Sequence, residues 1–192
     1  MLPTFRDRYE NALDGRSRGV EIVVHRRSPN GLSGWAAHNL ASTKYRHSAT
    51  GEPFAGDYDQ RHTVNMYGVY RFSDRITFSA RFRAGSNFPV PGFFESREAG
   101  RSAPTGPPPF YFVSTTRNNL RVPVYSRLDV RANRTFSLRA TRITLFAEVL
   151  NAYARDNVRA SPPGVNAANF QAFGLFDSMF PLIPSAGLSL EF

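Results

Sequence analysis

Apolar and polar side chains alternate with period two along most of the chain, the pattern of β-strands with one apolar face. In residues 75–84 the apolar face consists of Ile76, Phe78, Ala80, Phe82 and Ala84, and Arg, Thr and Ser alternate with them. The same pattern predicts strands over residues 20–24, 32–45, 62–72, 121–131, 142–149 and 184–192. No segment has a convincing helical period. The sequence therefore predicts an all-β antiparallel fold of about seven strands.

Short and long connections between these strands alternate strictly. The short ones are the Ser-Pro-Asn-Gly turn at 28–31, the turn at 73–74 and a link at 133–140. The long ones are polar or rich in Pro and Gly and cover 46–58, 87–120 and 154–179. A β-sandwich gives no reason for loop length to sort by sheet end, whereas outer-membrane barrels have short periplasmic turns and long extracellular loops.

The apolar stripes have the length that a membrane strand requires. Each contains four or five side chains, which matches the 9–11 residues of a tilted spanning strand. The opposite stripes carry charged and hydroxyl side chains, as a wet lumen requires. Aromatic residues lie near the stripe ends, at Tyr45, Tyr70, Phe72, Tyr153 and Phe192. Alternation alone also fits a soluble sandwich, but the loop asymmetry favours a transmembrane β-barrel segment.

Composition narrows the function classes. The chain has 192 residues, a net charge of +9 and no cysteine, which excludes disulfides and thiolate metal sites. Its cations are arginines interspersed among apolar residues, with Lys44 the only lysine, so we expect no nucleic-acid partner. The first ten residues lack the apolar stretch of a signal peptide. We expect that the protein either stays inside the cell or has its true N-terminus elsewhere.

Seven segments together resemble TonB-dependent outer-membrane receptors. They are Arg-Gly-Val-Glu-Ile at 18–22, Asp-Gln-Arg-His at 59–62, Tyr-Arg-Phe at 70–72, Gly-Ser-Asn-Phe-Pro at 85–89, Tyr-Ser-Arg-Leu-Asp-Val-Arg at 125–131, Glu-Val-Leu-Asn at 148–151 and Pro-Ser-Ala-Gly-Leu-Ser-Leu-Glu-Phe at 184–192. The resemblance covers about Gly15 to Phe192. It implies that residues 18–192 are the C-terminal part of a 22-stranded barrel and that residues 1–17 are an extracellular loop remnant or disordered. Nothing resembles the family's plug domain or TonB box.

The number of predicted strands indicates, independently of this resemblance, that the chain forms only part of a barrel. Closed single-chain bacterial barrels have at least eight strands and even numbers of them. An unclosed sheet would expose unpaired backbone groups to lipid, each costing several kcal/mol. We therefore expect the chain to be the C-terminal third of a longer receptor or a truncated reading frame, not transport-competent alone.

The resemblance also implies a location and partners. The location is the cell outer membrane, where lipid and lipopolysaccharide surround the barrel. The barrel-assembly machinery would read the terminal stripe Leu188, Leu190 and Phe192. The TonB complex and the plug domain would act through the missing N-terminal part. The nutrient taken up would be a siderophore, cobalamin, glycan or peptide.

Two groups of residues are candidates for binding. One polar stripe would face the lumen and either contact the plug or touch substrate: Arg121, Tyr125, Arg127, Asp129 and Arg131. The long loops hold aromatic residues that would either capture ligand or pack together to close the mouth: Phe93, Phe94, Phe110, Tyr111, Phe112, Phe170, Phe173 and Phe176.

Catalytic and metal motifs are absent from the sequence. The four histidines form no HExxH pattern, and there is no nucleophile elbow. His47 has acidic residues nearby and is either a cation ligand or part of a solvated loop. Asp59 is expected to pair with Arg61 or to end its loop. We expect no enzyme activity, cofactor or metal. The alternative to a receptor segment is a soluble basic β-sheet module that binds an anionic partner.

Overall fold

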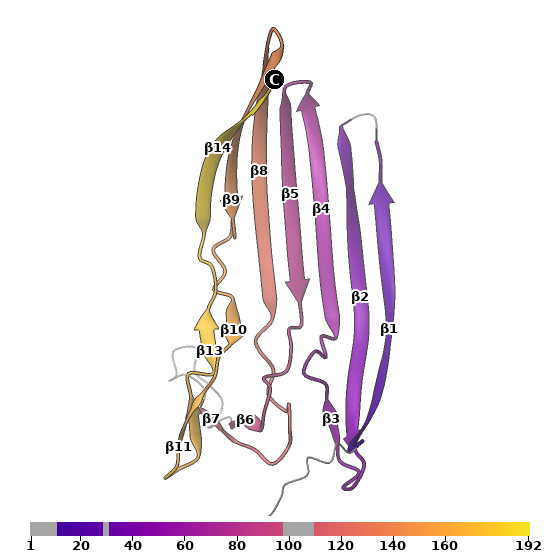
Figure 1. Cartoon of the computed structure of the whole chain (residues 1–192), viewed down its shortest axis with the longest axis vertical. Helices are drawn as coiled ribbons and strands as arrows, with labels where there is room; N and C mark the ends of the chain where they lie inside the picture. Colours follow the sequence, from indigo (N-terminus) through magenta and orange to yellow (C-terminus); the bar gives the residue numbers. More distant parts are fainter. Residues whose placement is uncertain (1–10, 29–30, 98–109) are drawn as a thin grey trace, which may run out of the picture.

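Seven long strands form one antiparallel sheet in the computed structural model, which describes residues 11–28, 31–97 and 110–192 (Figure 1). Along the sheet they are β1 (Leu13–Arg26), β2 (Leu32–His47), β4 (His62–Ser73), β5 (Ile76–Gly85), β8 (Tyr125–Leu138), β9 (Thr141–Leu150) and β14 (Ile183–Glu191). The described residues contain no helix, so the all-β antiparallel prediction and the seven long strands are confirmed. No helix in this part of the chain is long and apolar enough to cross a membrane.

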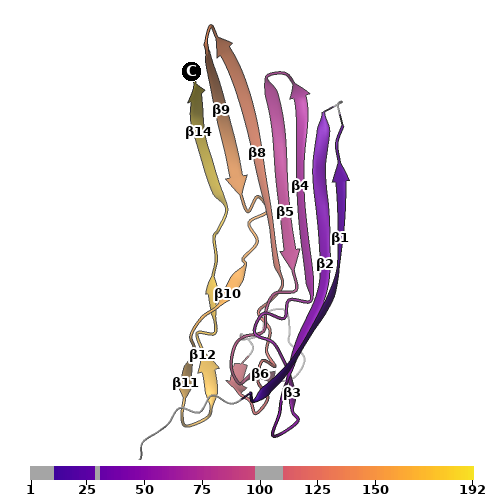
Figure 2. The same cartoon turned by 45° about the vertical axis from the view of Figure 1, so that its right-hand side comes forward.

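The connections sort by sheet end, as the sequence predicts. Residues 27–31, 74–75 and 139–140 join strands at one end. Residues 48–61, 86–124 and 151–182 join them at the other, which we call the long-connection end (Figures 1 and 2). Within the 86–124 connection, residues 98–109 lie outside the described part, as do Pro29 and Asn30 of the first turn.

The strand register places the apolar stripes on one face of the sheet, which we call the apolar face. Met66 lies opposite Phe82, and Phe82 lies opposite Leu128. Farther along, Leu145 lies opposite Leu188. The polar stripes share the other face, the polar face, where Arg81 lies opposite Asp129. A one-residue slip in any pair would mix the two faces.

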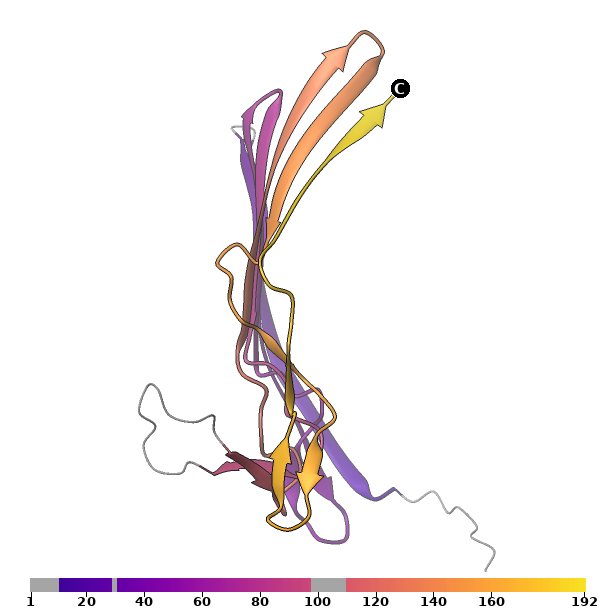
Figure 3. The same ribbon diagram turned by 90° about the vertical axis from the view of Figure 1, so that its left-hand side faces the viewer.

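Nothing in the described part of the chain covers the apolar face. The side chains of Ile22, Met66, Phe78, Leu145 and Leu188 are 44–61% exposed. Seen from its edge, the sheet is a single curved layer (Figure 3). Strands β1 and β14 each pair on one side only in this part, so the described sheet is open and forms no closed barrel.

Strands β8 and β1 differ most from their predicted ranges. Strand β8 begins at Tyr125 instead of residue 121, because Pro123 has no N–H for the ladder. It continues to Leu138, so most of the expected 133–140 link is strand. Asn133, Thr135 and Ser137 of that segment lie on the polar face, where Asn133 donates to Thr77 at 3.2 Å. Arg134 lies on the apolar face, with its guanidinium 4.9 Å from the centre of the Phe136 ring. Strand β1 (Leu13–Arg26) is longer than the expected strand at 20–24 and includes residues 13–17, which were expected to be an extracellular loop remnant or disordered. Residues 1–10 of that segment lie outside the described part.

The small hydrophobic core lies in the connections and not in the sheet. Its buried members are Val90, Val122, Ala172 and Leu175. Short strands that sequence reasoning missed stabilise the connections: β3 (Pro53–Ala55) on β2, β10 (Val158–Ala160) with β13 (Phe176–Ser178), and the order β11 (Gly164–Asn166), β12 (Gln171–Phe173), β7 (Phe110–Val113) and β6 (Phe94–Arg97). These pairings bring the 86–124 and 151–182 connections together.

Candidate functional site

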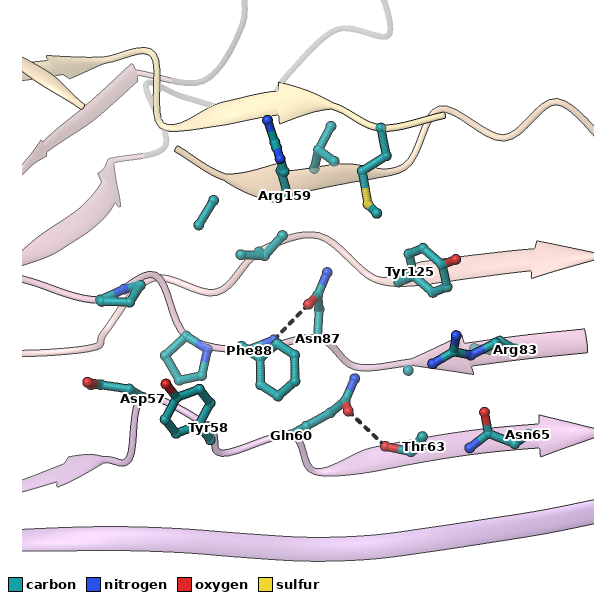
Figure 4. A pocket seen from close by; sticks show the side chains of 18 residues that line it. Asp57, Tyr58, Gln60, Thr63, Asn65, Arg83, Asn87, Phe88, Tyr125 and Arg159 are labelled. Atoms are coloured by element: carbon teal, nitrogen blue, oxygen red, sulfur yellow. Dashed lines mark hydrogen bonds between the residues drawn. The ribbon is translucent and has the colours of Figure 1, made fainter. Parts of the chain in front are cut away.

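The polar face carries a cavity of about 560 Å³ at the long-connection end. Strands β4, β5 and β8 form its floor, with Asn65, Arg83 and Tyr125 among the lining residues (Figure 4). Residues of all three long connections form its rim. The volume lies within the range of about 300–1,000 Å³ that small-molecule sites occupy. We therefore take this cavity as the candidate ligand site.

A glycine and a left-handed asparagine shape the cavity. Gln60 lies against Gly85, where an added Cβ would come within 2.5 Å of its amide nitrogen. The side-chain oxygen Oε1 of Gln60 accepts a hydrogen bond from the Thr63 hydroxyl at 3.0 Å. Asn87, the second residue after β5, adopts a φ of 60°, and its side chain donates to the Pro123 carbonyl at 3.0 Å. These contacts fix the turn from the floor to the rim.

Aromatic side chains stand on one side of the rim. The amide of Phe88 donates to Asn87 Oδ1 at 3.0 Å, which sets the direction in which the chain leaves the turn (Figure 4). The Phe88 ring meets the Tyr58 ring edge-on, with centroids 6.3 Å apart. Tyr58 is 86% exposed, so its ring is accessible from solvent.

The floor contains a cation without a carboxylate partner. Arg83 lies opposite Arg127 across the β5–β8 pair. Arg127 donates to both oxygens of Asp129, at 2.6 and 2.8 Å, whereas Arg83 has no ion pair in the described part of the structure. Arg159 lines the opposite side and pairs loosely with Asp177 at 3.7 Å. The cavity is therefore suited to ligands with carboxylate, phosphate or other electron-rich oxygens.

A buried ion pair supports the rim from below. Asp59 is 1% exposed and pairs with Arg121, and Arg61 approaches it at 3.6 Å. The Thr43 amide also donates to Asp59, at 2.7 Å. Burial alone raises the pKa of Asp59, but the hydrogen bonds from Thr43 and Arg121 and the two positive charges outweigh it, so the pKa lies below its ordinary value.

The predicted polar stripe is divided by the structure. The expected strand over 121–131 is wrong at its start, because Arg121 precedes β8. The Arg121 guanidinium binds the Asp59 carboxylate and the Asp59 backbone carbonyl. Tyr125 lines the cavity. Arg127, Asp129 and Arg131 border a second depression farther along the polar face.

This second group is held by contacts within the face. Arg131 lies 3.5 Å from Glu148 and 3.9 Å above the centre of the Phe146 ring. Asp129 accepts the Asn151 amide at 3.0 Å as well as the Arg127 guanidinium. Asn151 is 1% exposed, and its side chain donates to the Phe180 carbonyl at 3.2 Å. The group therefore anchors the corner that follows β9.

The aromatic residues of the long connections fall into two groups by burial. Phe94, Tyr111 and Phe176 pack on the connection core, and Tyr111 and Phe176 meet edge-on at 5.4 Å. Burial raises the pKa of the Tyr111 hydroxyl.

The other loop aromatics are more accessible. Phe93, Phe170 and Phe173 are 50–62% exposed, and ligand contact by these residues stays a prediction. Phe112 belongs to β7, and the Phe110 side chain lies outside the described set.

The terminal stripe lies on the apolar face. Leu188 lies opposite Leu145, and Leu190 opposite Ile143. Phe192 follows β14 and is 95% exposed.

One side-chain pair was missed because it is visible only through strand register. His38 and His62 stack with centroids 5.6 Å apart and planes 8° from parallel. The cation hypothesis for His47 finds no support nearby: Asp57 pairs with Arg117, and Asp59 pairs with Arg121. Among the described residues no group of three His, Asp or Glu side chains is arranged to hold a metal ion.

Comparison with known proteins returns no family model, curated protein or solved structure that matches the chain.

Proposed function

We propose that the chain is the C-terminal segment of the 22-stranded barrel of a TonB-dependent receptor in the outer membrane, and that it serves uptake of a scarce nutrient. The proposal combines the resemblance of its strand and loop segments with the geometry of the sheet. By itself the segment does not transport, because its two edge strands lack neighbours in the described structure.

The observation that carries the proposal is the uncovered apolar face. From Leu32 to Leu40 the alternating stripe of β2 extends roughly 26 Å at 3.3 Å per residue, close to the apolar band of about 25 Å on outer-membrane barrels. A soluble sheet of this size covers such a face with a second layer. Lipid supplies that cover without any further chain.

The polar face supports the transport role. In a closed barrel it lines the lumen, and its charges are compensated by neighbours such as Glu148 for Arg131. The cavity above β4, β5 and β8 then lies at the extracellular mouth, where Arg83 is available to an anionic nutrient. Siderophore, cobalamin, glycan and peptide remain the nutrient classes proposed.

Adjacent cysteines on opposite faces of β5 test the membrane placement. Ala80 is on the apolar face and Ser79 on the polar face, and the sequence contains no cysteine to interfere. Ala80→Cys and Ser79→Cys would each be labelled with bimane in outer membranes from the source cells, with the unsubstituted protein as background. We expect nitroxide-labelled lipid to quench bimane at position 80, and aqueous iodide to quench it at position 79.

A second pair tests orientation. Thr50 lies in a long connection and Ala140 in a short turn. We expect a membrane-impermeant maleimide to label Thr50→Cys on intact cells, and Ala140→Cys only after the outer membrane is opened. Recovery of the protein in the soluble fraction, with neither bimane site quenched by lipid, would reject the proposal in favour of the soluble anion-binding module.

A further inference from the structure

Strands β1 and β2 carry a cluster of cations next to the apolar face at the long-connection end. Arg16 lies opposite Lys44, and Arg18 lies opposite Ser42. The four side chains line a depression of about 150 Å³. We define Arg16, Arg18 and Lys44 as the β1–β2 cation cluster.

The cluster lacks compensating charge. Like charges directly opposite each other destabilise a strand pair, yet none of the three cations has a carboxylate within 4.0 Å in the described residues. Asp14 shares the same face but makes no ion pair with any residue in the described ranges, and Arg46 lies opposite it. Arg83 on the polar face also lacks an ion pair in the described part of the chain, but Arg127 opposite it is paired with Asp129. In the cluster, neither Arg16 nor Lys44 opposite it has a carboxylate partner among the described residues.

The cluster borders the apolar stripe directly. The next pair along the strands is Val20 opposite Leu40, and Ile22 and Val24 follow on the same face of β1. From Arg18 to Val24 the strand extends roughly 20 Å at 3.3 Å per residue. One leaflet has a hydrocarbon depth of about 15 Å. A lipid whose acyl chain lies on Val20–Val24 therefore has its head group next to the cations.

We propose that the β1–β2 cation cluster binds the phosphate group of an anionic lipid whose acyl chains lie on Val20, Ile22 and Leu40. This inference rests on the proposed function, since it requires lipid against the apolar face. Two arginines and a lysine around a small depression are donors for phosphate oxygens. Binding of the phosphate also removes the repulsion between Arg16 and Lys44.

Lipid titration of the intact protein tests the proposal. The protein would be extracted from source outer membranes into dodecyl maltoside, and dioleoyl phosphatidic acid or neutral dioleoylglycerol would be added. Native mass spectrometry then measures the lipid bound to each protein. We expect saturable binding of phosphatidic acid and much weaker binding of dioleoylglycerol.

A double variant isolates the cluster. Each cation near an anionic lipid surface contributes about fivefold to binding, so Arg16→Gln with Lys44→Gln should weaken phosphatidic acid binding about 30-fold. The matched control, Arg71→Gln with Arg81→Gln, removes the same charge from the polar face and should leave affinity unchanged. Because the cluster variant removes repulsion, its thermal melting in lipid-free micelles should not fall, which excludes misfolding as the cause.

Other results of these experiments would overturn this inference or the proposed function. Equal affinity for the two lipids, or equal loss in both double variants, overturns the proposal. Competition by millimolar inorganic phosphate at the same site would mean that the cluster takes free phosphate and not lipid, and also overturns it. If the protein is never found in the outer membrane, the proposed function fails. If it is found there but the cluster variant keeps its lipid, only this inference fails.

Discussion

Asp59 and Arg121 are 62 positions apart in the chain and form an ion pair in which the carboxylate is 1% exposed. The pair joins the connection after β2 to the connection after β5. Because Thr43 of β2 also donates to Asp59, the pair ties two connections to the sheet beneath the candidate cavity.

Loss of Arg121 should therefore loosen the rim. Arg121→Met leaves the Asp59 carboxylate buried without its main partner, a change that costs on the order of 3 kcal/mol. We expect faster proteolysis of the 48–61 and 86–124 connections. The control is Arg142→Gln, which breaks the exposed pair with Glu191 and should cost less than about 1 kcal/mol. Equal proteolysis rates in the two variants would contradict the role assigned to Asp59.

The same pair predicts acid sensitivity. The folded pKa of Asp59 lies below its ordinary value of 3.8. The ionised carboxyl therefore stabilises the rim fully above about pH 3.8, and the contribution is lost as pH falls through the lower folded pKa. Amide hydrogen exchange rates in the 48–61 connection would be measured between pH 5 and pH 2 and divided by the intrinsic exchange rate at each pH. We expect this ratio to rise as the pH falls. Asp59→Asn should abolish this rise. If the variant keeps the rise, another titrating group causes it.

Two opposed glycines on β2 and β4 should respond differently to alanine. Gly34 lies opposite Gly68. A Cβ at Gly34 would meet the Tyr67 carbonyl at 2.3 Å, whereas a Cβ at Gly68 meets nothing within 4 Å. Gly34→Ala should destabilise the strand pair by about 1–3 kcal/mol, and Gly68→Ala should be tolerated. Urea denaturation in micelles measures both, and equal midpoints would contradict the close approach at Gly34.

Leu188 provides a test of depth in the membrane. Under the proposed function its side chain faces lipid, so Leu188→Arg should cost about 2–4 kcal/mol near the bilayer centre. Ser189→Arg on the polar face is the control and should cost much less. Urea titration of the protein refolded in phospholipid vesicles gives both values. Equal costs would mean that both faces of β14 meet water.

The sheet could be predicted because the pattern that indicates each strand lies within that strand's own residues. Period-two alternation indicates a strand without knowledge of its neighbours, and polar connections separate the strands. Strand ends were less accurate: Asn133, Arg134 and Thr135 suggest a loop, but Asn133 and Thr135 continue the polar face of β8 between Ala132 and Phe136 of the apolar face.

The candidate cavity was not predictable from local patterns. Its rim depends on Arg121 reaching Asp59, and its floor on the register that places Arg83 opposite Arg127. The pairing of Asp59 with Arg61 was expected and is found at 3.6 Å, because those residues are neighbours in sequence. The connection core was missed because four small or branched apolar residues from distant segments form no periodic pattern.

Strand direction restricts what can complete the open sheet. All neighbouring long strands are antiparallel, so β1 and β14, the first and seventh, run the same way (Figure 2). Joining them directly would create one parallel pair, and so would joining two copies of the chain with their long connections on the same side. Antiparallel closure requires an odd number of additional strands, the first and last of which run opposite to β1 and β14. The counterpart of this seven-stranded sheet therefore also has an odd number of strands, and its outer strands run in the opposite direction.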